Sequence, residues 1–118
     1  MRSEVVFACD MGALEPGQRT EHHDVMRALF GAVVSVRPAE DGYRFTLADS
    51  DEVVALVGRF IALERRCCPF FDFGLYVAPD EAPELVIRGP AGVEPFIQAE
   101  FGAVLPLGVG FPSNGAQR

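Results

Sequence analysis

The stretch SDEVVALVGRFIALERRCCPFF, residues 50–71, decides the fold because it has the pattern of one long amphipathic helix with a sharp end. When each residue is advanced by roughly 100°, its apolar side chains gather on one broad stripe. Asp49 or Ser50 supplies an N-cap. Pro69 disfavours helical geometry at the residue before it, so the helix is predicted to end at Cys68.

The rest of the chain alternates short apolar runs with clusters of Gly, Pro and Asp, which predict strands and turns. In chain order the predicted elements are a strand over 5–9, a helix over 19–30, a hairpin of strands over 33–37 and 43–47, the helix over 50–68, a second hairpin over 71–77 and 85–88, and a helix over 92–101. This β-α-β-β-α-β-β-α order predicts an α+β sandwich, ferredoxin-like with an added strand and helix. Its sheet is expected to be largely antiparallel, with the helices on one face.

Length and composition indicate a single α+β domain over residues 1–104, followed by a tail over 105–118 that is rich in Gly and Pro. The net charge of −7 argues against nucleic acid or an anionic membrane surface as a partner. The apolar run near Met1 is too short for a signal peptide, and no stretch reaches the ~20 apolar residues of a membrane span. Three cysteines, two of them adjacent, do not predict a disulfide framework. We therefore expect a reduced chain in the cytoplasm.

The adjacent pair Cys67-Cys68 is the most distinctive chemical feature of the sequence. Disulfide-bonded cysteines usually have Cα atoms ~4.4–6.8 Å apart, whereas neighbours across a trans peptide are ~3.8 Å apart, so a bridge within the pair would be strained. The pair is therefore expected as two free thiols or as two thiolates that share an ion. Thiolates select Cu(I) and Zn(II), and the same softness argument extends to Hg(II) and As(III).

Glu64 lies near the middle of the apolar stripe, one turn before the pair. An isolated buried charge is very costly, so this carboxyl must be protonated, paired or bound to something. It could ligate an ion or transfer a proton as a catalytic group. Alternatively, it pairs with an arginine such as Arg19 or reaches solvent past the helix end.

Cys9 and His22 are two further candidates for the site. In the predicted topology Cys9 lies on the order of 13–16 Å from the pair, so it is structural, or the topology differs, or a partner chain contributes it. His22 leans toward the apolar side of its helix and imidazole is a metal ligand, yet residues 21–24 also fit a polar first turn. Cys67 and His22 are the residue types of a cysteine hydrolase, but no motif supports that activity.

The segment E-x-x-C-C-P-F-F, with an A-C dipeptide near the start of the chain, resembles a group of small, mostly uncharacterised bacterial proteins associated with mercury or other heavy-metal resistance. The resemblance spans most of the chain. Its specific motif is confined to 64–71, with Cys9 as a weaker match. It implies a soft-metal site at Cys67 and Cys68, with Glu64 and Cys9 as further ligands.

Three functions follow from these residues. The first is cytosolic binding of a soft metal or metalloid (Hg, Zn, Cu or As(III)) or of a small thiol-reactive ligand. The second is a thiol-dependent enzyme for organometal cleavage or redox chemistry, in which Glu64 donates or accepts a proton. The third is a structural or interaction module whose cysteines only fill the core. A homodimer formed through an edge strand of the sheet, or through the hydrophobic parts of the tail, is compatible with all three.

Overall fold

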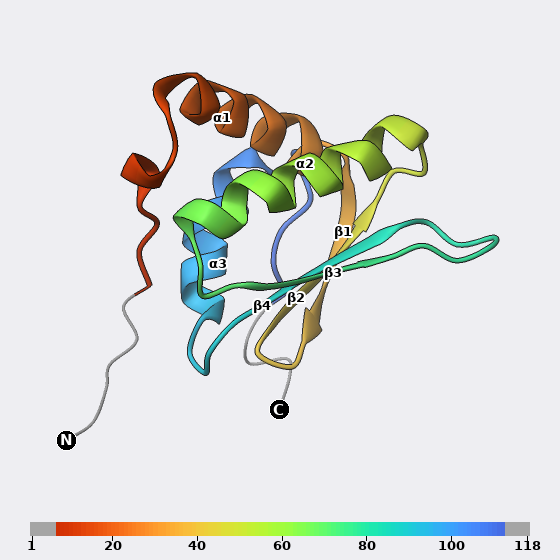
Figure 1. Ribbon diagram of the computed structural model, residues 1–118. Coiled ribbons are helices and arrows are strands. Elements are labelled where there is room, and N and C mark those ends of the chain that lie inside the picture. The colour runs from red at the N-terminus through yellow and green to blue at the C-terminus, as the bar shows by residue number, and fades with distance from the viewer. Residues whose placement is uncertain (1–6, 113–118) are drawn as a thin grey trace.

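A computed structural model describes residues 7–112, and its strands form one four-stranded sheet. Figure 1 shows the helices gathered over one face of this sheet. The α+β class and the antiparallel sheet are confirmed. In chain order the elements are η1 (Met11–Ala13), α1 (Pro16–Phe30), β1 (Val33–Ala39), β2 (Gly42–Leu47), α2 (Asp51–Cys67), β3 (Asp72–Tyr76), β4 (Glu84–Arg88), α3 (Glu94–Phe101) and η2 (Gly102–Val104).

The sheet consists of two hairpins joined through their inner strands, in the order β1-β2-β4-β3, with every neighbouring pair antiparallel. Phe45 of β2 lies opposite Val36 of β1 and Leu85 of β4, so three apolar side chains share one face. At the start of β2, a Cβ on Gly42 would collide with the backbone carbonyl oxygen of Ile87. Glycine at this position therefore permits the close pairing of β2 with β4.

An aromatic cluster joins the three helices to the sheet. Phe30 of α1 stacks on Phe101 of α3, with ring centroids 4.5 Å apart. It also meets Phe60 of α2 and Phe45 of β2 edge-on at 5.4 and 5.3 Å. All four rings are fully buried. Such offset and edge-on pairs stabilise the core beyond their area burial, and they fix where the end of α2 lies relative to α1 and α3.

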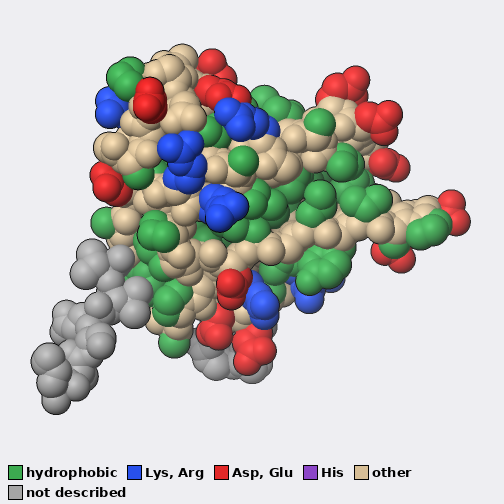
Figure 2. All heavy atoms as spheres, in the orientation of Figure 1, with side chains coloured by type: hydrophobic (Ala, Val, Ile, Leu, Met, Phe, Trp, Pro, Cys, Tyr) green, Lys and Arg blue, Asp and Glu red, His purple; other side chains and the backbone are tan. Residues whose placement is uncertain are grey.

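Helix α2 forms as predicted. The Ser50 hydroxyl accepts a hydrogen bond from the Val53 N–H at 3.1 Å, and Cys68 closes the other end by donating its N–H to the Glu64 carbonyl at 2.8 Å. Acidic residues occupy the first turn and Arg65 and Arg66 the last, as the helix dipole favours. Figure 2 shows this gradient, with acidic side chains at the start of α2 and basic side chains toward its end.

The strand predicted over 5–9 is wrong for Phe7 to Cys9, which form no strand; Val5 and Val6 lie outside the described residues. This segment instead crosses the end of α2, where the Asp10 N–H donates to the Cys67 carbonyl at 2.7 Å. Its backbone is thus satisfied by a helix end and not by a sheet. The described order is therefore α-β-β-α-β-β-α.

Helix α1 begins at Pro16, three residues before the predicted start. Proline fits the first helical turn because its missing N–H has no intrahelical acceptor there. A reciprocal capping box between Glu15 and Gln18 completes this end. The proline and the capping box are both readable in the sequence, and they place the start of the helix before Arg19.

Residues 105–112 contain no helix or strand, but Phe111 packs on Tyr43 with ring centroids 4.8 Å apart and also meets Phe45. The chain after η2 therefore returns to the inner face of β2. Residues 113–118 lie outside the described part of the chain. Within residues 7–112, none of the helices has the combination of length and apolarity that a bilayer crossing demands.

We expect Phe101→Ala to lower the free energy of unfolding by about 3–5 kcal/mol, because it removes a buried ring shared by α1, α2 and α3. Urea unfolding followed by circular dichroism would measure the loss. Leu107→Ala is the matched control, since Leu107 is fully exposed. Equal effects of the two substitutions would show that α3 does not belong to the core.

Candidate functional site

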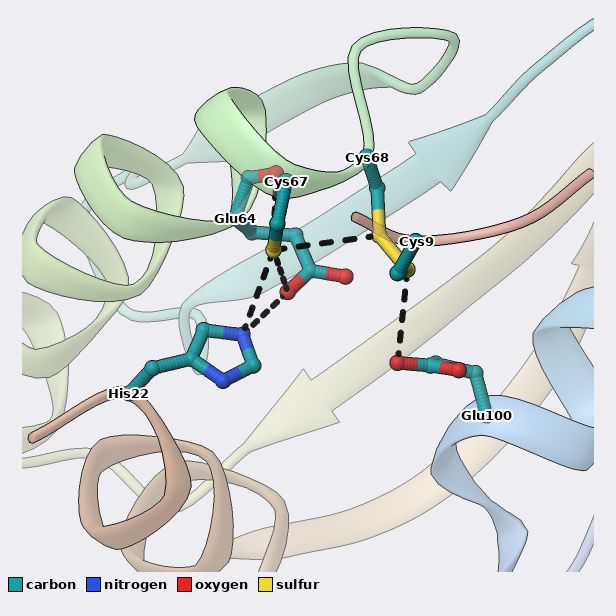
Figure 3. A network of polar contacts seen from close by, with 6 residues as sticks. All are labelled: Cys9, His22, Glu64, Cys67, Cys68 and Glu100. Carbon is teal, nitrogen blue, oxygen red and sulfur yellow. Dashed lines mark hydrogen bonds and ion pairs between the residues drawn. A yellow bond between two sulfur atoms is a disulfide. The ribbon is translucent and has the colours of Figure 1, made fainter. Parts of the chain in front are cut away.

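Six ionisable or sulfur-bearing side chains converge where the N-terminal segment crosses the end of α2 (Figure 3). They come from four parts of the chain: Cys9 before η1, His22 from α1, Glu64, Cys67 and Cys68 from the end of α2, and Glu100 from α3. All four residues predicted for a metal site, Cys9, Glu64, Cys67 and Cys68, are brought together here.

Glu64 is fully buried and paired with His22, whose side chain is only 4% exposed. His22 Nε2 lies 2.5 Å from Glu64 Oε1. The alternative pairing with Arg19 is wrong, because the Arg19 guanidinium donates instead to the carbonyls of Met11 and Leu14. The expectation that Glu64 needs a partner is confirmed, but the partner is a histidine on α1.

The same histidine nitrogen also faces a thiol, with His22 Nε2 3.9 Å from Cys67 Sγ. Hydrogen bonding to Cys67, and then to Glu64, raises the pKa of His22 to about 10, although burial opposes the shift. The imidazole is therefore protonated at neutral pH. A buried cation thus stands between a carboxylate and a sulfur, where it offsets negative charge on either one.

This arrangement does not match a cysteine hydrolase built from Cys67 and His22. In such sites the carboxylate orients the imidazole through one ring nitrogen while the other faces the nucleophile. Here the Glu64 carboxylate and Cys67 Sγ both face Nε2. The carboxylate and the sulfur therefore share one ring nitrogen, and the imidazole does not link them through its two nitrogens as it does in such a site.

Cys9 and Cys68 form a disulfide with Cα atoms 4.6 Å apart, while Cys67 is a free, buried cysteine. The expectation of a reduced chain with a free thiol at Cys68 is therefore wrong. Of the alternatives for Cys9, the one that holds is a topology that differs from the predicted one. The reason is the path of the N-terminal segment, which runs across the helix end and not along the sheet. The predicted absence of a bridge within the pair is confirmed, with Sγ atoms of Cys67 and Cys68 4.0 Å apart.

The three sulfur atoms nevertheless lie within 4.8 Å of one another. Cys67 and Cys68 are fully buried, whereas Cys9 is partly exposed. Cys68 is the C-cap, and its backbone is no longer helical, with φ −127° and ψ 74°. This change of direction lets two adjacent cysteines take different partners. The sulfurs form one cluster that belongs to two chain segments.

A carboxylate oxygen of Glu64 lies within 4.8 Å of the sulfurs of Cys9 and Cys68 and of a Glu100 oxygen. Glu64 Oε2 is buried and has no hydrogen-bond partner among residues 7–112. A buried acceptor without a partner typically costs about 1–3 kcal/mol. In Figure 3 the free oxygen of Glu64 points toward the disulfide, so the site holds an unused ligand atom beside the sulfurs.

Sequence reasoning missed Glu100. Its Oε2 lies 3.6 Å from Cys9 Sγ, and burial, followed by the negative charge of Glu64, raises its pKa, while the His22 charge opposes the shift. No local motif marks this residue, because only the packing of α3 against the N-terminal segment brings it to the site. The neighbouring histidine, His23, has a side chain that is 61% exposed and lies outside the cluster.

Aromatic rings hold the N-terminal segment beside the sulfurs. Phe7 packs edge-on against Phe70 at 5.4 Å and lies 6.1 Å from Phe96, and Phe70 meets Phe96 at 5.3 Å. Phe7 and Phe70 are each two residues from a cysteine of the disulfide. Aromatic packing therefore restrains both of the segments that the bridge joins.

No protein-family model, curated protein or solved structure matches this chain closely enough to show a relationship. The resemblance of the Glu64–Phe71 motif to heavy-metal resistance proteins stays a prediction.

The protonation of the buried His22 should make the free energy of unfolding depend on pH. Because its pKa is raised from 6.5 to about 10 on folding, the stabilisation is fully present below about pH 6.5 and is lost as the pH rises through about 10. We expect the free energy of unfolding to fall between these values. Urea titrations at a series of pH values would show this slope, and His22→Gln should reduce it while His23→Gln should not. An unchanged slope in His22→Gln would contradict the assignment.

Removing one partner of the buried pair should cost far more than removing an exposed one. We expect Glu64→Ala to destabilise the fold by about 3–5 kcal/mol, because the His22 cation is left buried without its carboxylate. Glu21→Ala breaks the exposed pair with Arg59, which solvent screens, and should cost far less. Chemical denaturation of both variants provides the comparison. Similar losses would mean that the His22–Glu64 pair is not an important element of stability.

Proposed function

We propose that the reduced protein binds one soft metal or metalloid ion through Cys9, Cys67 and Cys68. The observation that carries this proposal is the convergence of three sulfur atoms within 4.8 Å of one another. Thiolate sulfur is the ligand type that selects Cu(I) and Zn(II), and the softness argument includes Hg(II) and As(III). Reduction of the disulfide releases the thiols of Cys9 and Cys68, which join the free thiol of Cys67.

The charge balance of the site also favours a cation. Three potential thiolates and the carboxyl groups of Glu64 and Glu100 share one corner, and the His22 imidazolium is the cation that lies among them. Anionic ligands in a low-dielectric site attract a metal ion more strongly than they would in water. The free Oε2 of Glu64 is a candidate fourth ligand, as a tetrahedral zinc site would require.

The remaining sequence predictions extend this proposal. The resemblance to heavy-metal resistance proteins supports a role in buffering, relaying or sensing a toxic ion. A cytoplasmic location would keep the thiols reduced. A homodimer through an edge strand of the sheet is compatible with this role.

A second candidate is an enzyme that cleaves an organometal compound. The observation that favours it is the protonated imidazole 3.9 Å from Cys67 Sγ and 2.5 Å from Glu64 Oε1. A proton delivered from this pair would replace the metal on carbon, while two sulfurs retained the metal. Loss of turnover in Glu64→Gln with metal binding intact would support the enzyme over a binding protein.

Titration of the fully reduced protein tests the proposed binding function. Hg(II), Zn(II) and As(III) would each be added in the presence of a competing monothiol, with thiolate–metal ultraviolet absorption and free-thiol counting as readouts. We expect one equivalent of a soft ion to protect all three thiols. Cys67→Ser/Cys68→Ser should lose this binding, whereas Asp10→Asn keeps the three sulfurs and should retain it. Binding seen only after unfolding would mean that the cysteines are part of the core.

A further inference from the structure

The disulfide and the proposed metal site use the same atoms. Cys9 and Cys68 supply two of the three clustered sulfurs, and both are consumed by the bridge. In the oxidised protein only Cys67 keeps a thiol. Whatever opens the bridge therefore decides whether the three-sulfur site exists.

The two ends of the bridge differ in access. Cys68 is fully buried at the end of α2, whereas Cys9 is partly exposed. The segment around Cys9 carries no helix or strand of its own. Besides the bridge, the contacts that hold it include the hydrogen bond from Asp10 N to the Cys67 carbonyl and the packing of Phe7 on Phe70 and Phe96. An incoming thiolate must reach a sulfur directly, so Cys9 Sγ is the point of attack.

We propose that the protein undergoes thiol–disulfide exchange with a small thiol at Cys9 Sγ, and that this exchange opens the soft-metal site. The second half of this inference rests on the proposed function. The incoming thiolate forms a bond to Cys9 Sγ as the Cys9–Cys68 bond breaks, and the electron pair leaves on Cys68 Sγ. A second thiol molecule then attacks the mixed disulfide at the small-molecule sulfur. The small thiol is oxidised to its disulfide, and Cys9 is released as a thiolate.

The geometry favours Cys68 as the leaving sulfur and leaves Cys67 as a bystander. In the bridged protein, Cys68 Sγ lies 4.0 Å from Cys67 Sγ, which in turn lies 3.9 Å from His22 Nε2. Attack by Cys67 on Cys68 would require a bridge between adjacent residues, whose Cα spacing of ~3.8 Å is shorter than disulfides prefer. Attack by Cys67 on Cys9 would only move the bridge and would not reduce it. Release of all three thiols therefore needs an external thiol, and a variant without Cys67 should still react.

Ion binding and bridge formation exclude each other, because both occupy the sulfurs of Cys9 and Cys68. Each must then disfavour the other by the same factor, as linkage requires. A bound ion protects the site from oxidation, and oxidation expels the ion. Thiol status would in this way set the metal affinity of the protein.

The exchange step can be tested without any metal. The oxidised full-length protein would be mixed with reduced glutathione, quenched with acid at early times, and mapped by peptide mass spectrometry. We expect the glutathione adduct on Cys9, in the wild type and equally in Cys67→Ser. An adduct on Cys68, reaction only after unfolding, or three free thiols in the protein after mild oxidation would each overturn the inference.

The link to the metal is tested separately. The reduced protein would be exposed to diamide, a thiol oxidant, with and without the soft ion that binds in the titration, and bridge formation would be followed by mass. At an ion concentration of about ten times Kd, we expect bridge formation to slow by roughly tenfold. An unchanged rate would disprove the mutual exclusion. If no ion binds the reduced protein, the proposed function fails, while the glutathione result still decides the exchange at Cys9.

Discussion

The buried contact between His22 and Glu64 is the constraint on which the rest of the site depends. A carboxylate in the apolar stripe of α2 is tolerated only if another element brings it a partner, and α1 does so with an imidazole whose pKa rises to about 10. This pairing fixes the turn of α2 that precedes the cysteines. The stacking of Phe30 on Phe101 then fixes the position of α3 against α1. The sulfurs lie where these restraints meet.

Much of the fold could be predicted from local signals. The Ser50 cap, the apolar stripe and the break at Pro69 define α2, and alternation with turn residues defines both hairpins. The strand predicted at Val5 to Cys9 is wrong for Phe7 to Cys9, because an apolar run indicates only that the segment is buried against something. It does not state whether a sheet or a helix end covers it. Here the end of α2 offered a free carbonyl at Cys67, and the segment bound to it.

The site was predictable to the extent that its residues are near in sequence. Glu64, Cys67 and Cys68 follow from one helical turn, and burial of Glu64 required a partner. The identity of that partner was not predictable, because His22 lies on another helix in a stretch that also fits a polar first turn. Cys9 lies 59 residues before Cys68, and it reaches the site only because the N-terminal segment packs there. Glu100 lies on α3, and it reaches the site only because that helix packs beside Cys9. Such contacts are set by tertiary packing and leave no local pattern.

The bridge also has a topological consequence. It closes a covalent ring that spans 59 residues of separation and encloses α1, β1, β2 and α2. In the chain-entropy treatment, a ring of this size restricts the unfolded chain by about 4 kcal/mol. Opening the bridge removes this restraint, so that the stability of the fold depends on noncovalent interactions alone. An ion held by Cys9 and the two helix-end sulfurs would join the same two segments again, so that coordination bonds would replace the lost covalent tether.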